Sequence, residues 1–213
     1  QVLAGKIEAQ KRLLVQSEIK LLQAQINPHF LFNALNTLAA IIRRDPEEAR
    51  RIVQYLSTFF RKSLKRVSTE ATLKDEIEHV DAYLRIELAR FAGRMDVDIC
   101  IPDELLGMHL PAFTLQPIVE NAVKYGLSQL IEPGRIAIRA ERQDDRLTIV
   151  VEDSAGLYKP LPKNDGMGMG LVDRRIKIRY GEAFGIAVLC EPERWTRVFI
   201  SLPAEEECEA GAC

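Results

Sequence analysis

One histidine of this chain lies in a stretch that combines a proline, an amide side chain and several large apolar residues. Residues 24–33 read AQINPHFLFN. Pro28 suits the first position of a helix, with Asn27 as a cap before it. On that helix His29 and Asn33, four residues apart, share a face. An imidazole held beside an amide can act as a nucleophile near neutral pH, and a helix with one satisfied histidine is the alternative.

A second group of chemistry-bearing residues lies on a helix predicted over residues 113–125. Asn121 and Lys124 are three residues apart there, so an amide oxygen and an ammonium group share one face. An amide oxygen suits a hard cation such as Mg²⁺, and an ammonium group suits a phosphate. Taken alone, the pattern also fits a plain amphipathic helix.

Two glycine-containing stretches follow. Asp153 ends a predicted strand with a carboxylate that can accept from an exocyclic amine such as that of adenine, and Gly156 permits close approach of a flat ring. Gly166, Gly168 and Gly170 precede a predicted helix, where backbone amides can cradle phosphates. No Gly-Lys-Ser/Thr follows them, which excludes a P-loop, and no βαβ unit surrounds them. In this order the features predict a site for adenine, phosphates and Mg²⁺.

Helices are predicted to carry the histidine. Residues 1–26 show a heptad-like seam, which predicts a coiled-coil segment and a homodimer, with a monomeric amphipathic helix as the alternative. Helix is predicted to resume at residue 28 and to continue to about residue 44. Asp45 and Pro46 cap and begin the next helix, and a third opens at residue 72 and ends near residue 91.

The composition changes after this helical part, which is predicted to span residues 1–92. Alternating apolar residues predict strands, and helices are predicted between them. The predicted strands are residues 95–101, 135–140, 146–151, 186–190 and 197–202. This order predicts an α+β domain over residues 93–204, with helices on one face of a mostly antiparallel sheet, and an acidic disordered tail over residues 205–213.

The composition excludes several classes of protein. Of the 213 residues, 47% are hydrophobic and 28% are charged, as in ordinary soluble domains. A net charge of −2 gives no general basic field, so no direct binding of nucleic acid is expected. No apolar run reaches the length of a membrane helix, and no signal peptide is visible. The cysteines show neither pairing nor metal spacing, and His79 is predicted to lie on the surface and not to bind zinc.

Taken together, these motifs resemble those of the LytS/YehU group of sensor histidine kinases in two-component systems. The resemblance rests on five stretches: residues 27–33, 83–91, 116–126, 152–158 and 166–171. It implies an N-terminal helical hairpin for dimerisation and phosphotransfer, followed by a Bergerat-type ATPase α/β sandwich. ATP and Mg²⁺ are the cofactors that it implies.

The resemblance also implies roles for single residues. His29 would take the γ-phosphoryl group of ATP, and Asn121 would coordinate Mg²⁺. Lys124 would lie near the phosphates. Tyr125 would be a further cofactor-binding residue, standing where the group more often has His. Asp153 would recognise the adenine amine.

The glycines have implied roles as well, and one acid has two interpretations. Gly156 would line the adenine pocket, while Gly166, Gly168, Gly170 and the adjacent Leu171 would form the lid hinge and phosphate cradle. Glu120 is a candidate catalytic acid/base for His29, and an outward-facing helix residue is the alternative.

Some positions depart from the pattern of the group. Ser154 and Ala155 replace the usual residues after the aspartate, which makes nucleotide affinity an open question. Phe30 follows the histidine where many other kinases place an acid, so the base that activates His29 is not obvious.

The resulting hypothesis is autophosphorylation of His29 and transfer to an aspartate of a response regulator receiver domain. The chain would be a homodimer and the cytoplasmic portion of an inner-membrane sensor kinase, with the membrane sensor domain upstream. Two alternatives stay open: a signalling scaffold with a weak ATP site, and an ATP-hydrolysing conformational clamp of the same fold.

Overall fold

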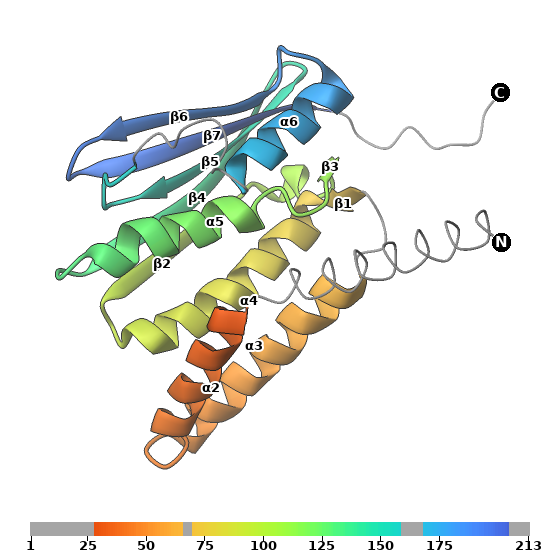
Figure 1. Cartoon of the computed structure of the whole chain (residues 1–213). Coiled ribbons are helices and arrows are strands. Elements are labelled where there is room, and N and C mark those ends of the chain that lie inside the picture. Colours follow the sequence, from red (N-terminus) through yellow and green to blue (C-terminus); the bar gives the residue numbers. More distant parts are fainter. Residues whose placement is uncertain (1–27, 66–69, 159–167, 205–213) are drawn as a thin grey trace, which may run out of the picture. The chain divides into compact units, whose positions relative to one another are not determined.

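The computed structural model describes residues 28–65, 70–158 and 168–204 (Figure 1). The chain divides into two compact units, Gln1–Lys65 and Arg66–Cys213. The predicted coiled-coil segment, residues 1–26, and the predicted acidic tail, residues 205–213, lie outside the described residues.

The first unit contains a pair of helices, α2 (Pro28–Ile41) and α3 (Pro46–Lys65). The carboxylate of Asp45 accepts a hydrogen bond from the backbone N–H of Glu48 at 2.9 Å, which confirms the predicted cap. Acidic side chains occupy the first turn of α3, where they complement the helix dipole. The two helices are thus consecutive in the chain and are joined by a short connection.

Aromatic packing holds this helix pair together. The rings of Phe30 and Phe59 lie with their centroids 4.9 Å apart, and both side chains are buried. Smaller apolar residues complete the core: Ala34, Ala49, Ile52 and Leu56. Because Phe30 anchors α2 in this core, the preceding side chain, His29, is directed to another side of the helix and is exposed.

The second unit is built on a five-stranded sheet with the strand order β2-β4-β5-β7-β6. The strands are β2 (Met95–Cys100), β4 (Gly134–Gln143), β5 (Arg146–Asp153), β6 (Gly185–Glu191) and β7 (Trp195–Pro203). Only the β2–β4 pair is parallel among these strands. The predicted α+β class with a mostly antiparallel sheet is confirmed.

Three helices cover one face of this sheet: α4 (Leu73–Phe91), α5 (Gln116–Asn121) and α6 (Met169–Tyr180) (Figure 1). Along β5 and β7 every second residue is buried, as expected for a sheet with one covered face. The buried carboxylate of Asp153 ends this pattern on β5. The Asp153 carboxylate therefore lies on the face of the sheet that the helices cover.

Helix α4 belongs to the second unit, whereas the sequence grouped it with the preceding helices in residues 1–92. The predicted start of this helix at residue 72 is confirmed: Thr72 is its N-cap, and the Thr72 hydroxyl accepts from the Asp75 N–H at 3.1 Å. Ala92 and Gly93 end the helix with positive φ angles of 50° and 85°. Most of α4 is buried, and its first turn hydrogen-bonds to residues 106–108 of the same unit.

Several short elements were not predicted. Strands β1 (Glu70–Thr72) and β3 (His109–Pro111) form a separate antiparallel pair, and three residues are too few to show alternation. The predicted helix 113–125 begins at α5 and changes to π geometry over Ala122–Gly126. Two 3₁₀ turns, Asp103–Leu105 and Leu127–Gln129, complete this region. None of the helices within the described ranges has the length and apolar character to cross a bilayer.

Candidate functional site

His29 lies in the first turn of α2 with its side chain exposed. The amide nitrogen of Asn33 lies 3.3 Å from its Nδ1 and 3.4 Å from its Nε2, so the predicted shared face is confirmed. An amide N–H can donate only to a ring nitrogen that carries no proton. The amide can therefore hold the ring through a nitrogen that has a lone pair, and a nitrogen of that kind can attack an electrophile.

In the second unit, the end of α5 meets the glycine-rich stretch that precedes α6. A Cβ atom on Gly168 would lie 3.5 Å from Nδ2 of Asn121 and 3.4 Å from Cβ of Pro117. The backbone at Gly168 therefore passes directly over the amide of Asn121. The structure thus brings together two motifs that are far apart in the sequence.

Asp153 lies at the C-terminal end of β5 and is 6% exposed. Its Oδ1 accepts a hydrogen bond from the backbone N–H of Ala155 at 2.9 Å. Burial raises the pKa of the Asp153 carboxyl, and hydrogen bonds from the backbone of Ala155 and Gly156 and from Thr196 partly offset this rise. The carboxylate is thus held in one orientation by the residues that follow it.

The two departures after Asp153 have structural roles. Ser154 Oγ accepts from the backbone N–H of Arg135 at 2.8 Å, and its own N–H donates to Arg135 O at 3.0 Å. Ala155 is 1% exposed, so a larger side chain would not fit without rearrangement. Both residues fix the end of β5 and thereby the position of Asp153.

Gly156 has a left-handed backbone, with φ at +60°. A Cβ atom there would lie 2.3 Å from the carbonyl oxygen of Glu191 and 2.5 Å from the backbone nitrogen of Arg194. The side on which a residue would carry its side chain therefore faces the turn between β6 and β7. Close packing on that turn, as well as φ, requires glycine at this position.

The other predicted ligands lie on the surface. Lys124 and Tyr125 are exposed on the π segment, and the Lys124 ammonium lies 4.8 Å from the centroid of the Tyr125 ring. Leu171 is 62% exposed in the first turn of α6, and a Cβ atom on Gly170 would meet nothing within 4 Å. Gly166 lies outside the described residues.

His79 was predicted to be on the surface, and this prediction was wrong: the side chain is 0% exposed. Its Nε2 lies 2.6 Å from Oε1 of Gln116, and Nε2 of Gln116 donates to Oε1 of Glu120 at 2.7 Å. The reason is that α4 packs on α5 along the face that carries His79. A signal was available, because His79 and the aromatic Tyr83 are four apart and share a helix face.

Glu120 is half-buried rather than turned fully outward. Burial raises the pKa of its carboxyl, while the hydrogen bond from Gln116 and the charge of Lys124 lower it. A carboxylate whose pKa is moved toward neutrality is better suited to accept a proton.

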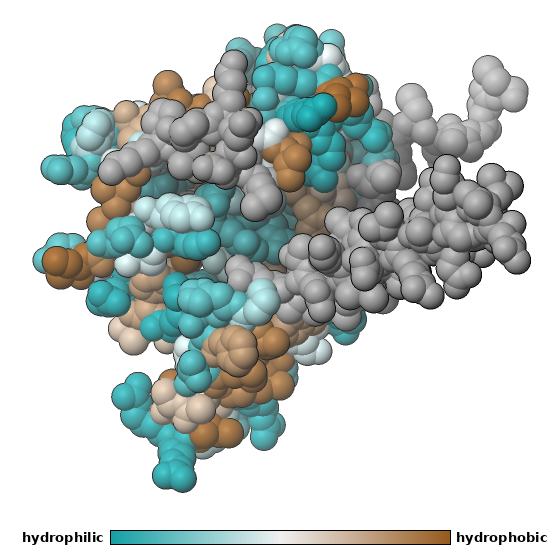
Figure 2. Space-filling model, viewed as in Figure 1, coloured by the Kyte–Doolittle hydropathy of each residue, from teal (hydrophilic) through white to brown (hydrophobic). Residues whose placement is uncertain are grey.

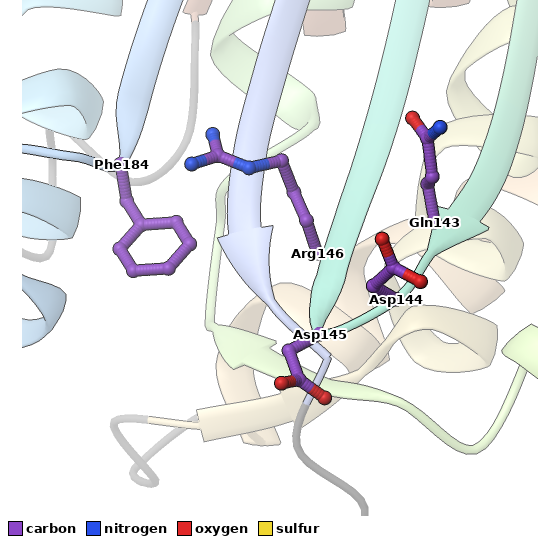
Figure 3. Close-up of a pocket in the computed structure, with 5 residues that line it drawn as sticks. All are labelled: Gln143, Asp144, Asp145, Arg146 and Phe184. Carbon is purple, nitrogen blue, oxygen red and sulfur yellow. The ribbon is translucent and has the colours of Figure 1, made fainter.

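The surface hollows found among the described residues are not lined by the predicted site residues. One of about 360 Å³ is lined by Gln143, Asp144, Asp145, Arg146 and Phe184 (Figure 3). In the close-up the Arg146 side chain extends toward the Phe184 ring, and its guanidinium carbon lies 5.0 Å from the ring centroid. Arg146 begins β5 and Asp153 ends it, so this hollow is at the opposite end of the strand from the predicted site.

The side chains at the end of α5 fit a magnesium ion. The Asn121 amide offers a hard oxygen donor, and Mg²⁺ binds through few protein oxygens together with water and phosphate. Among the described residues, no group of three or more His, Cys, Asp or Glu side chains could hold a metal ion by itself. Phosphate oxygens would have to complete the coordination.

Comparison with known proteins gives consistent relatives. A family model described as "Histidine kinase" matches residues 17–95. Sensor histidine kinase BtsS of Escherichia coli K12 is 60% identical over 97% of this chain and 37% of its own length. Sensor protein LytS of Bacillus subtilis is 32% identical over 95% of this chain and 36% of its own length. The chain thus spans little more than a third of each of these relatives.

One solved structure similar to the chain is histidine kinase ThkA in complex with response regulator protein TrrA. It has a TM-score of 0.47 and 19% identity, and the match covers 94% of this chain and 65% of that one.

Proposed function

The chain belongs to the sensor histidine kinases, and from that premise we propose that it uses ATP to phosphorylate its own His29. The phosphoryl group then passes to an aspartate of a response regulator receiver domain. The observation that carries this proposal is the exposed imidazole of His29, held beside the Asn33 amide on a helix anchored by Phe30. A histidine that served only the core would not be exposed in this way.

Asp153 recognises the base of ATP in this proposal. Its carboxylate accepts from the backbone of Ala155 and Gly156 and from Thr196, and a carboxylate has about four acceptor positions, so it can also accept from the exocyclic amine of adenine. Because the carboxylate is buried and held in one orientation, this hydrogen bond costs little conformational entropy.

The end of α5 and the backbone at Gly168 receive the phosphates. Asn121 would hold Mg²⁺, which when bound neutralises charge on the phosphate oxygens. Lys124, exposed on the adjoining π segment, supplies a further positive charge. Positioning and charge neutralisation supply most of the catalysis of phosphoryl transfer.

The chemical step joins an imidazole nitrogen of His29 to the γ-phosphorus as the bond from that phosphorus to the ADP oxygen breaks. The proton on the other ring nitrogen must then leave. We assign Glu120 as the acceptor of this proton, since burial moves its pKa toward neutrality. The reaction takes place within one chain or between two chains of a dimer.

We also propose a homodimer formed through the helix pair of the first unit. Large apolar side chains are exposed there, with Phe32 at 67%, Leu35 at 47% and Val53 at 50%. Figure 2 shows apolar side chains gathered over α2 and α3. A second copy of the same pair would bury them, as in helical bundles. In the full protein an upstream membrane sensor domain would control this dimer, and the chain would be its cytoplasmic portion.

The test is the intact mass of the protein after incubation with Mg-ATP, measured beside a His29→Gln variant. We expect one acid-labile phosphate on the wild type and none on the variant. Labelling of the variant to the same extent would overturn the assignment of His29. Release of free phosphate without labelled protein would instead indicate an ATP-hydrolysing clamp, and failure to bind millimolar Mg-ATP would indicate a scaffold.

A further inference from the structure

We propose that Arg175 is a positioning residue for the phosphates and the magnesium ion of ATP. By binding the residues just before α5, its guanidinium group holds the start of α6 over Asn121. This inference rests on the proposed function, because it concerns the ATP site assigned there. It goes further by giving a role to a half-buried arginine that is not among the predicted site residues.

The contact of Arg175 joins α6 to the segment that leads into α5. Nη2 of Arg175 donates to the backbone carbonyl oxygen of Phe113 at 3.2 Å and lies 3.4 Å from Oγ1 of Thr114. Thr114 is 0% exposed, and its own hydroxyl donates to the carbonyl oxygen of Pro111 at 2.6 Å. The Thr114 oxygen can therefore still accept, and Nη2 carries two N–H groups for the two oxygens. Arg175 thus ties α6 to residues 113 and 114.

The segment that receives Arg175 is held from another side by α4. The carboxylate of Glu76 accepts from the backbone N–H groups of Phe113 and Leu115 at 2.8 and 2.9 Å. Phe113 has a left-handed backbone, with φ at 59°, which sets the direction of its carbonyl group. Burial lowers the pKa of Arg175, and the opposite charge of Glu76 partly offsets this effect. Phe113 is therefore bound to α4 through its N–H and to α6 through its carbonyl group.

The start of α6 and the end of α5 meet at the proposed phosphate site. A Cβ atom on Gly168 would lie 3.5 Å from Nδ2 of Asn121, so the backbone there lies against the amide. Arg175 follows Gly168 by seven residues, which is close to two helical turns, so both lie on one face of α6. The residues that they contact lie between 113 and 121. Arg175 therefore holds this face toward α5 at a second point.

Other contacts hold α6 on the sheet. The helix packs on β6 and β7, and its side chains Val172 and Ile176 are buried. Oδ1 of Asp173 accepts from the backbone N–H of Ile186 in β6 at 2.8 Å. Loss of the Arg175 contact should therefore leave α6 folded on the sheet and free its start to move away from Asn121.

The guanidinium group is not arranged for stability alone. Nε of Arg175 is buried and has no hydrogen-bond partner among the described residues. A buried N–H without a partner costs stability, so a side chain without that group need not weaken the fold. A positioning role and a purely structural role of Arg175 can therefore be told apart by experiment.

The experiment compares three variants of Arg175 in the whole chain. Arg175→Met removes the charge and the hydrogen bonds, and Arg175→Gln keeps a polar group that ends two bonds short of Nη2. Arg175→Lys keeps a charged donor that ends one bond short of it. Arg174→Met, at an exposed position on the same helix, removes the same charge and is the matched control.

The measurements separate the phosphates from the adenine. Calorimetry gives the affinity for Mg-ATP, and an NMR titration gives the affinity for AMP, which lacks the two outer phosphates. The side-chain amide resonances of Asn121 are recorded without nucleotide, and urea unfolding gives the midpoint of each variant.

We expect Arg175→Met and Arg175→Gln to lower the affinity for Mg-ATP by about 10- to 100-fold, as when a group that supports a metal ligand is removed. The affinity for AMP, which depends on the adenine contact of Asp153, should change much less. The Asn121 resonances should move even without nucleotide, while the urea midpoint stays near that of the wild type. Arg175→Lys should recover part of the affinity for Mg-ATP.

Each contrary result has a definite meaning. Equal losses of affinity for Mg-ATP and AMP would indicate a purely structural role and overturn the proposal. Unchanged affinity for Mg-ATP in Arg175→Met and Arg175→Gln, or an equal loss in Arg174→Met, would overturn it as well. If Arg175→Met does not fold, Arg175→Gln gives the answer, because it keeps a polar group at this half-buried position.

Failure of the proposed function would look different. A wild type that binds Mg-ATP and forms no phosphohistidine would contradict the phosphorylation of His29 and leave the role of Arg175 to be decided by the affinities. A wild type that binds no Mg-ATP would overturn both proposals.

Discussion

A Cβ atom on Gly126 would lie 3.1 Å from Oδ1 of Asp153, so the carboxylate occupies space that any larger residue would need. The same atom would lie 3.4 Å from Cβ of the buried Ala155. The last residue of the π segment therefore packs directly on the proposed adenine-binding group. Helix α5 and strand β5 are coupled at this contact.

Gly126→Ala should therefore displace Asp153 and weaken ATP binding. Overpacking of this kind costs about 1–3 kcal/mol, and if that cost falls on the binding position of Asp153, affinity falls by roughly 5- to 150-fold. Calorimetric titration with Mg-ATP measures it. Gly107→Ala is the matched control, since its Cβ would meet nothing within 4 Å, and equal affinities of the two variants would contradict the prediction.

Asp153→Asn should lower the affinity for ATP without lowering the stability of the fold at pH 7. With Oδ1 still held by the Ala155 N–H, the new amide nitrogen would face the adenine amine, donor against donor. We expect ATP affinity to fall by about tenfold or more. We also expect the variant to be at least as stable as the wild type at pH 7, because it removes a charge whose burial raises the pKa of Asp153.

The pH dependence of this stability difference has a definite sign. The folded-state pKa of Asp153 lies above its unfolded value, so the folded state binds this proton more tightly. The penalty for the buried charge is therefore complete above the folded pKa and disappears as the pH falls toward the unfolded value. Urea unfolding at a series of pH values should show the advantage of Asp153→Asn shrinking with acidification. An advantage that grows would contradict the assigned shift.

The sequence predicted which side chains belong to the candidate site, but it predicted less well how the helices and strands pack around them. The cap at Asp45, the strand that ends at Asp153 and the shared face of His29 and Asn33 depend on local spacing, which a sequence displays directly. The burial of His79 depends on which side of α4 meets α5. The spacing of His79 and Tyr83 places both on one helix face but does not say what covers that face, and the acids beside His79 in the sequence favoured an exposed position.

The glycines show the same difference between what local sequence reveals and what depends on packing between distant elements. Their number and place before a helix could be read from the sequence, and they suggested contact with a ligand. The structure shows that Gly156 meets the turn between β6 and β7, while Gly126 meets Asp153. Such contacts join elements that are distant in the chain, so composition and periodicity do not reveal them.

Glu76 anchors the segment that leads into α5, and its removal should destabilise the second unit. Its two carboxylate oxygens accept from the backbone N–H groups of Phe113 and Leu115 at 2.8 and 2.9 Å, and the side chain is 0% exposed. A glutamine has only one acceptor oxygen, so Glu76→Gln leaves one buried N–H opposite another donor.

We expect Glu76→Gln to lower the free energy of unfolding by about 2–3 kcal/mol. Denaturant titration followed by circular dichroism measures the change. The exposed Glu78→Gln on the same helix should stay within about 0.5 kcal/mol of the wild type. A loss no larger than that of this control would show that the two backbone N–H groups find other acceptors.

The contact between Asn33 and His29 leads to a prediction about how the phosphorylation rate depends on pH. Asn33 places an amide nitrogen 3.3 Å from Nδ1 of His29, and an amide N–H can donate only to a ring nitrogen that carries no proton. In Asn33→Asp a carboxylate takes this place, and a carboxylate beside an imidazole stabilises the protonated ring. Less of the reactive neutral form is then present at pH 7, and the rate should fall about tenfold.

The expected signature is a shift of the acid limb of the rate profile toward higher pH, with recovery of much of the rate in alkaline buffer. Asn33→Ala removes the donor without adding a charge, so it should lower the rate without moving that limb as far. Asn36→Ala, at an exposed position on the same helix, should leave the profile unchanged. Initial rates of phosphohistidine formation from pH 5.5 to 9, at saturating Mg-ATP, distinguish these variants. If Asn33→Asp lowers the rate by the same factor at every pH, the amide acts on the orientation of the ring and not on its protonation.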